Sequence, residues 1–486
     1  MRRDSGPGYG SPVPDAAPPF TPDAAADAGV TRASDGTAGA PGAWRAELAA
    51  TLRLAVPVAG IQLGLMLMGV VDVVMVGRVS ATALAAVALG NIVFYGVAQF
   101  GLGTLMALDP LVSQAVGAGD RDAAAFALQR GVVLAAAAAA PLALLMWPAE
   151  WVFARAGQPA DVVPVAGAFV RASVGGVLPY LMFGVLRQAL QAMHHTRAVV
   201  AAMVAGNVAN LVGNVALVHG RWGAPPLGAV GSAWSSTAAR WLMAAVLLAA
   251  AWPVLGPALR PWRRAALAPR ALGSLARVGA PIGVQQCLEF FAFGLTGLMM
   301  GRLGTVPMAG HETTLNLAAL VFMVPLGVGA AAAVRVGHAV GRGDPAGARR
   351  AARMATFVGV GFMAATAVAM LGAPRALAGL YTTDAAVLAV AAALIPLAGV
   401  FQVFDGLQVV SLGVLRGVGD TRGPMLINLV GFWLVGLPAG AWLCFGRGLG
   451  ARGLWWGLVV GLATVSVVLA ARVRRRLAGR LARTVA

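Results

Sequence analysis

The chain has 486 residues, of which 59% are hydrophobic and only 11% are charged, and its formal net charge is +18. Soluble domains carry about 25% charged residues, so this composition excludes an ordinary soluble globule and indicates an integral membrane protein. The basicity would suggest nucleic-acid binding in a soluble chain. Arginines that flank membrane spans explain it without nucleic acid.

The first 45 residues differ from the rest of the chain. Residues 1–45 are rich in Pro, Gly, Ala, Ser and Asp and have no apolar periodicity, so we expect a disordered cytoplasmic tail. A bilayer core about 30 Å thick needs about 20 apolar residues per helix. Windows of that length predict twelve spans, at about 51–77, 83–108, 124–147, 162–183, 198–219, 228–252, 276–301, 309–333, 353–373, 386–412, 424–446 and 451–471.

The arginines predict the orientation of these spans. All 36 basic residues are Arg, and if the spans alternate in direction most of them fall on the side of the two termini. The positive-inside rule assigns that side to the cytoplasm. We therefore expect a multi-pass protein of the cell (inner) membrane, monomeric, with both termini cytoplasmic.

The two halves of the chain resemble each other. An ungapped shift of 224 residues aligns Arg53 with Arg277, Pro57 with Pro281, Gln62 with Gln286, Gly103 with Gly327, Gly117 with Gly341 and Asp120 with Asp344. Because each half has six spans, both halves enter the membrane in the same direction, as in a parallel repeat. The predicted fold is an all-α membrane protein of twelve transmembrane helices, in two pseudo-symmetric six-helix bundles around a central cleft.

This repeat gives the expected domain boundaries. After the tail at 1–45 we expect an N-terminal six-helix lobe at 46–255 and a basic cytoplasmic linker at 256–275. A C-terminal six-helix lobe at 276–472 and a basic cytoplasmic tail at 473–486 follow. Two lobes that face each other suit alternating access to a site between them.

Three of the eighteen acidic residues, Asp72, Glu289 and Asp405, lie well inside predicted spans. A charge at the bilayer centre costs about 2.5–3.5 kcal/mol or more. Each acid is either a neutral or Arg-paired structural group, or a site for protons, metal cations or organic cations, and we favour the second interpretation. Asp109 and Glu312 lie near span ends, where a solvated or structural role is the better interpretation.

Amides accompany two of these acids. Asn207, Asn210 and Asn214 share one helix face, and so do Gln402, Asp405 and Gln408. Amides can donate to a carboxylate or offer oxygen atoms to a cation. Hydrogen bonding between neighbouring helices is the equally good alternative for the asparagines.

Other motifs are weak. Cys287 and Cys444 lie in apolar spans without metal-ligand spacing, and the turns GAGD at 117 and GRGD at 341 lack the Lys of a phosphate loop. We found no clustered nucleophile or His/Asp motif of an enzyme, and we expect no cofactor. Soft and aromatic side chains could line a site for a flat cation, although helix packing is the simpler interpretation for each: Met66, Met68, Phe290, Phe291 and Phe293.

Several segments carry a family resemblance. LMGVVDVVMVGRVSATALAAVALGN from Leu67, ALDPLVSQAVGAGD from Ala107, FMVPLGVGAAAAVRVGHAVGRGD from Phe322 and GVLRGVGDTRGP from Gly413 resemble signature segments of the multidrug and toxic compound extrusion (MATE) family. The resemblance covers residues 50–470 and is closest to the bacterial NorM-like branch. It implies two six-helix lobes that export cationic amphipathic small molecules in antiport with Na⁺ or H⁺ across the lipid bilayer.

The resemblance also implies site residues. Asp72 matches the first-helix acid of that branch, Asn210 and Asn214 its span-five amides, and Glu289 and Asp405 its acids in spans seven and ten. The coupling ion, H⁺ or Na⁺, would then bind at Asp72, Asn210 and Asn214 or at Glu289 and Asp405. Secondary candidates are Asn207, Gln402, Gln408 and Glu312.

One position departs from the family pattern, and two rival functions remain. His311-Glu312 stands where the family has His-Gln, which leaves the ion assignment open. A lipid-linked precursor flippase of the same superfamily would need a basic cavity for pyrophosphate, and a membrane enzyme would need a clustered catalytic motif. The three intramembrane acids favour the antiporter.

Overall fold

The computed structural model describes residues 43–484, so nearly all of the predicted N-terminal tail lies outside the described residues. Ten helices in this range are long and apolar enough to cross a bilayer. Two bent helix pairs raise the number to twelve if each pair is one span. The all-α membrane fold predicted from hydropathy is therefore confirmed.

The first half of the described chain forms ten helices and a short 3₁₀ turn. They are α2 (Ala43–Gly77), α3 (Ala81–Leu105), α4 (Leu108–Gly117), α5 (Arg121–Met146), α6 (Ala149–Arg155), α7 (Val163–Val174), α8 (Val177–Ala192), α9 (Thr196–His219), the turn at Arg221–Gly223, α10 (Gly228–Ala250) and α11 (Trp252–Leu259). We call this set the N-terminal lobe.

The second half begins after a 3₁₀ turn at Arg264–Leu267. It contains α12 (Pro269–Gly301), α13 (Thr305–Gly341), α14 (Pro345–Gly372), α15 (Pro374–Gly379), α16 (Ala385–Gly417), α17 (Arg422–Asn428), a π-helical segment (Leu429–Gly436), α18 (Leu437–Ala441), a second π-helical segment (Trp442–Gly446) and α19 (Gly450–Ala478). We call this set the C-terminal lobe.

Several predicted span boundaries differ from the structure. The fourth span is broken between α7 and α8, which meet at 47°, and α10 turns by 84° into α11. Consecutive glycines, Gly175 and Gly176, lie at the first break, where backbone freedom is greatest. α19 continues to Ala478, so the first residues of the predicted tail at 473–486 are helical.

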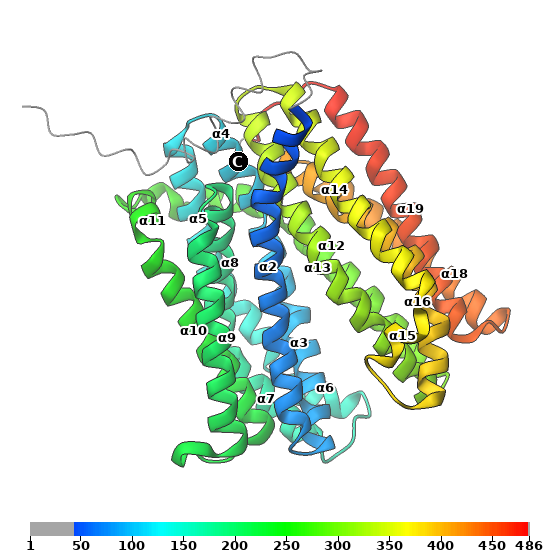
Figure 1. Ribbon diagram of the computed structural model, residues 1–486. Coiled ribbons are helices and arrows are strands. Elements are labelled where there is room, and N and C mark those ends of the chain that lie inside the picture. Colours follow the sequence, from blue (N-terminus) through cyan, green and yellow to red (C-terminus); the bar gives the residue numbers. More distant parts are fainter. Residues whose placement is uncertain (1–42, 485–486) are drawn as a thin grey trace, which may run out of the picture.

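The two lobes lie side by side and meet along central helices that include α2, α3, α12 and α13. Figure 1 shows the first half, blue to green, on one side and the yellow to red helices on the other. α2 packs against α13, and α3 packs against α12. Because α2 with α12 and α3 with α13 are counterparts in the repeat, these two contacts are related by the internal symmetry.

Glycines make this symmetry visible at atomic scale. A β-carbon on Gly103 would lie 2.7 Å from the Gly283 α-carbon, and one on Gly327 would lie 2.6 Å from the Ala59 nitrogen. The shift of 224 residues relates Gly103 to Gly327 and Ala59 to Gly283. The same backbone contact therefore occurs twice, once on each side of the lobe interface.

The lobes are joined mainly at the face where α2 begins and α19 ends, which we call the terminal face. Gln114 Nε2 donates to the Gly417 carbonyl at 2.8 Å, and Arg335 donates to Thr51 Oγ1 at 2.5 Å and pairs with Glu47. Toward the other face, α2 and the α16–α19 group diverge in Figure 1. The described lobes are therefore closed at the terminal face.

Candidate functional site

The first site is built around Asp72 of α2, which is only 7% exposed. Its Oδ1 accepts hydrogen bonds from Asn210 Nδ2 at 3.0 Å and Asn214 Nδ2 at 2.8 Å. Its Oδ2 accepts one from Ser236 Oγ of α10 at 2.5 Å. Three donors from two other helices suit an ionised carboxylate, because hydrogen bonds to a charged acceptor are the strong ones.

Helical spacing explains why the two asparagines converge on one acid. Asn210 and Asn214 are four residues apart on α9, so their side chains lie on one face, and both are fully buried. The Nδ2 of each asparagine donates to Asp72, and the Oδ1 of each lacks a hydrogen-bond partner within residues 43–484. Buried amide oxygens beside a carboxylate are the hard oxygen ligands that a small cation prefers.

The second site is built around Glu289 of α12. Its Oε1 accepts hydrogen bonds from Gln408 Nε2 of α16 at 2.7 Å and from Gln285 Nε2 at 3.3 Å. Gln408 Nε2 also contacts Asn428 Oδ1 of α17 at 3.3 Å. The sequence places Gln408 on one helix face with Asp405, and the structure adds its contact with Glu289.

Asp405 lies on α16, one turn before Gln408, and is partly buried. Asp405 and Gln408 lie on one face of α16, and Gln408 is the residue that donates to Glu289. Two neighbouring acids in an apolar setting can together hold one cation or share a proton.

A third polar contact crosses the lobe interface. Arg416 Nη1 of α16 lies 3.6 Å from Asp109 Oδ2 of α4, and both side chains are about nine-tenths buried. Asp109, expected near water or in a structural role, is therefore a buried interface residue. Its partner Arg416 lies on α16, the helix that also carries Asp405, so the ion pair connects the terminal face to that helix.

The secondary candidates have other local partners. Gln402 donates to the Ala318 carbonyl at 2.9 Å, so its amide joins α16 to α13 and does not reach the acids. Asn207 donates to the Gly64 carbonyl at 3.0 Å and not to Asp72. Glu312 is exposed near the start of α13.

The aromatic candidates separate into two groups. Phe293 packs against Phe401 and Phe432 inside the C-terminal lobe, as ordinary packing requires. Phe290 and Phe291 instead form an edge-to-face pair near Gly96 of α3 in the other lobe. Only this pair lies where the two lobes approach each other.

Sequence reasoning did not single out Ser236 or Asn428. Ser236 lies between Ser235 and Thr237 in the segment WSST, where nothing distinguishes it from its neighbours, and the packing of α10 on α9 brings it to Asp72. Asn428 lies near the start of its span, where polar residues are common and an amide does not indicate a site. Within residues 43–484, no group of three or more His, Cys, Asp and Glu side chains could hold a metal ion.

Fold and sites together define a two-lobed helical membrane protein of the transporter type, with carboxylates held inside each lobe. The MatE family model matches residues 57–216 and 281–442, which contain Asp72, Asn210 and Asn214 and Glu289 and Asp405 respectively. The chain belongs to the MatE family.

Curated relatives and solved structures agree with this assignment. The chain is 37% identical over 455 residues to the multidrug resistance protein NorM of Burkholderia vietnamiensis, which covers 91% of this chain and 96% of the relative. It is 38% identical over 454 residues to a probable multidrug resistance protein NorM of Deinococcus radiodurans, covering 90% and 97%.

Two solved structures share the fold. The eukaryotic MATE transporter AtDTX14 superposes with a TM-score of 0.79 at 24% identity, covering 92% of this chain and all of that one. An outward-facing MATE family transporter of the MOP superfamily superposes with a TM-score of 0.80 at 19% identity, covering 89% and 96%.

Proposed function

We infer that this protein is a secondary active multidrug efflux transporter, which exports cationic amphipathic molecules in exchange for Na⁺ or H⁺. The observation that carries this function is a carboxylate site in each lobe, buried at Asp72 and partly buried at Glu289 with Asp405. Membership of a family whose members include multidrug resistance proteins supports it. Buried acids without a lysine or arginine bonded to them attract cations.

In this proposal the two sites bind different cations. Asp72 is enclosed by Asn210, Asn214 and Ser236, so it suits a small coupling ion, whose oxygen ligands the amides could complete. Glu289 and Asp405 lie near the Phe290–Phe291 pair on the same lobe, where a flat organic cation could contact an aromatic face. Competition between the coupling ion and the drug for carboxylate charge links the two fluxes.

Alternating access needs a hinge and two closed states. The terminal face carries most of the arginines, so we place it in the cytoplasm, and the lobes closed there make the described state outward-facing. The close glycine contacts at the interface of α2, α3, α12 and α13 let the lobes rock without intervening side chains. The protein acts as a monomer in the inner membrane in this proposal.

The flippase alternative predicts a different charge. A pyrophosphate-bearing lipid needs cationic groups between the lobes. The Arg416 guanidinium at the lobe interface is already engaged by Asp109, and the acids of the two sites add negative charge. These contacts favour cation transport.

Binding in detergent tests this function directly. Purified protein should bind a fluorescent cation such as ethidium, and Na⁺ or low pH should reduce that binding. Glu289→Gln with Asp405→Asn should bind at least tenfold more weakly, because the countercharge is lost, whereas Asp122→Asn, an exposed acid paired with Arg263, should bind normally. An ethidium affinity that does not change with Na⁺, with pH or with the double substitution would exclude the proposal.

A further inference from the structure

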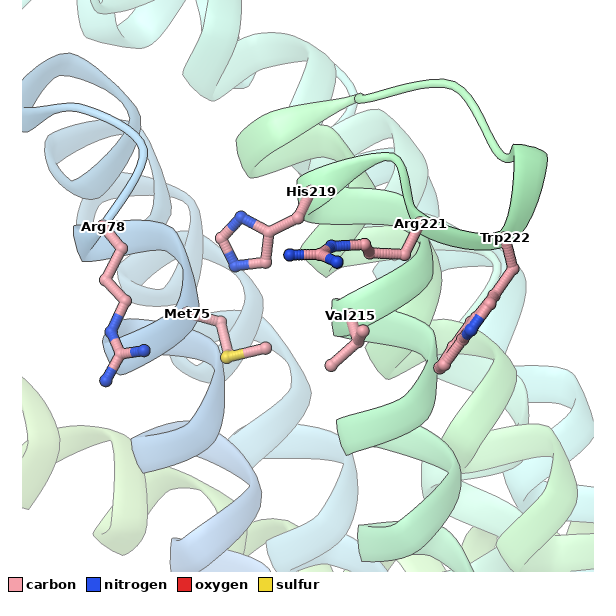
Figure 2. Close-up of a pocket in the computed structure, with 6 residues that line it drawn as sticks. All are labelled: Met75, Arg78, Val215, His219, Arg221 and Trp222. Carbon is pink, nitrogen blue, oxygen red and sulfur yellow. The ribbon is translucent and has the colours of Figure 1, made fainter.

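A cavity of about 390 Å³ opens at the end of the N-terminal lobe opposite the terminal face. It is lined by Met75 and Arg78 at the end of α2 and by Val215, His219, Arg221 and Trp222 at the end of α9. Figure 2 shows Arg221 and His219 extending from the end of α9 toward the end of α2, with Trp222 beside Val215. The rim is basic and the walls are apolar.

The charge of this cavity is not balanced by the protein. Arg78 and Arg221 form no ion pair with any residue in the range 43–484, and no acid is among the lining residues. Figure 2 shows the two arginines on opposite sides of the cavity, with Met75 and His219 between them. Two positive charges around one cavity attract an anion such as a phosphate, to which guanidinium N–H groups donate. A cationic drug or coupling ion would be repelled there.

The backbone of the rim is held in an unusual conformation. Trp222 has φ 57° and ψ 30°, a left-handed geometry that is unfavourable for a residue with a β-carbon. Gly220 and Gly223 on either side also have positive φ and allow the tight turn. The turn carries Arg221 and the 74% exposed Trp222 together to the cavity.

The surface below the cavity is apolar and exposed. Four and eight residues before Arg78 on α2, Val74 and Val70 are 48% and 45% exposed. Below Val215 on α9, Leu211 and Val208 are 46% and 57% exposed. Residues four apart lie on one helix face, so an apolar stripe runs from the cavity along each helix toward the middle of the span.

We propose that this cavity binds the phosphate of an anionic phospholipid, whose acyl chain lies on the apolar stripes of α2 and α9. Basic side chains and Trp at the ends of spans lie at the level of lipid head groups. The apolar stripes favour a lipid over a soluble phosphate, because a soluble anion has no acyl chain to bury against them. Met75 lies one turn beyond Asp72, so the bound lipid covers the outer end of the Asp72 site.

Native mass spectrometry of the full-length protein tests this site. Phosphatidylglycerol should remain bound to the wild-type protein, and phosphatidylcholine should be retained at least fivefold less. The double variant Arg78→Gln/Arg221→Gln should lose at least nine-tenths of the phosphatidylglycerol. Val215→Trp, which fills the cavity and leaves both arginines, should lose it as well.

The matched control removes two arginines elsewhere on the same face. Arg155 and Arg447 are stacked on Trp151 and Trp442 outside the cavity, and Arg155→Gln/Arg447→Gln should retain phosphatidylglycerol like the wild type. Equal retention in the wild type and Arg78→Gln/Arg221→Gln would overturn the proposal. Full displacement by millimolar glycerol 3-phosphate would overturn the lipid assignment, because the ligand would then be a soluble phosphate.

Discussion

Ser113 of α4 and Gly337 of α13 occupy equivalent positions in the two repeats and lie directly against each other. A β-carbon added to Gly337 would lie only 1.9 Å from Ser113 Oγ. Equivalent residues can touch only on the axis that relates the repeats, so this axis passes between α4 and α13. The terminal face is therefore closed by a symmetric contact that has no room for larger side chains.

A larger side chain at this interface should open the terminal face. A β-carbon on Gly341 would lie 2.1 Å from the Gln114 carbonyl oxygen. Overpacking costs about 1–3 kcal/mol, so Gly341→Val should shift the equilibrium away from the closed state roughly 5- to 150-fold. Spin labels at Arg121→Cys and Arg342→Cys, exposed on opposite lobes, should move apart and ethidium efflux should fall.

Gly361→Val is the control for this substitution, because the corresponding β-carbon on α14 would have nothing within 4 Å. It should leave the label distance and the efflux rate unchanged. If Gly341→Val also leaves both unchanged, the symmetric contact does not close the terminal face.

Removing the hydroxyl donor to Asp72 should weaken coupling. Ser236 Oγ donates to Asp72 Oδ2, and hydrogen bonds to charged groups are worth about 1.5–3 kcal/mol. Ser236→Ala should therefore slow gradient-driven ethidium efflux from vesicles by about tenfold. Ser466→Ala, whose hydroxyl bonds within α19, should behave like the wild type, and equal rates for both variants would exclude a role for the Ser236 donor.

Asp420, in the turn after α16, should make the stability of the folded protein depend on pH. Burial raises the pKa of this carboxyl, but hydrogen bonds from Arg472 at 2.7 Å and Arg476 at 2.7 Å outweigh burial and hold the pKa below its ordinary value of 3.8. A lowered folded-state pKa adds stability above the unfolded-state pKa, and this stability is lost as the pH falls through the folded-state value.

The measurement is the unfolding temperature of purified protein at pH 7 and near pH 3. Asp420→Asn should unfold at a lower temperature than the wild type at pH 7, and the difference should shrink near pH 3. Asp122→Asn is the control, since its acid is largely exposed and surface pairs contribute little. A difference that is constant with pH would contradict the assignment to Asp420 ionisation.

The segment after α19 should help to keep the lobes together. Thr484 N donates to Gln114 Oε1 at 2.6 Å, and Arg483 pairs with Asp120 at 3.2 Å, so the end of the C-terminal lobe binds the N-terminal lobe. Deleting residues 479–486 should lengthen the distance between spin labels at Arg121→Cys and Arg342→Cys, in a protein with Cys287 and Cys444 replaced by Ala. An unchanged label distance would mean that this segment does not hold the closed state.

Hydropathy and spacing predicted most of the fold because membrane spans are long and apolar. Asp72 was expected beside Asn210 and Asn214, because acids inside spans are rare and amides at helical spacing share a face. The contact between Glu289 and Gln408 was not expected from the sequence. The glycines alone do not mark the break at Gly175 and Gly176 in the sequence, because glycine is common in membrane helices.

Tertiary contacts account for the other misses. The Asp109–Arg416 pair joins residues in different lobes, and neither residue has a local signal that identifies the other. Gln402 shares a helix face with Asp405 in the sequence. In the structure, however, the Gln402 amide donates to the Ala318 carbonyl of the neighbouring α13. A shared helix face limits the possible partners of a side chain, and packing selects among them.

Ethidium transport in proteoliposomes with separately imposed pH and Na⁺ gradients tests the central claim most directly. At least one gradient should drive transport by the wild-type protein, and Asp72→Asn, Glu289→Gln and Asp405→Asn should each abolish most of the driven flux. Transport that ignores both gradients, or that persists in all three variants at normal expression, would contradict the assignment of these carboxylates to cation-coupled export.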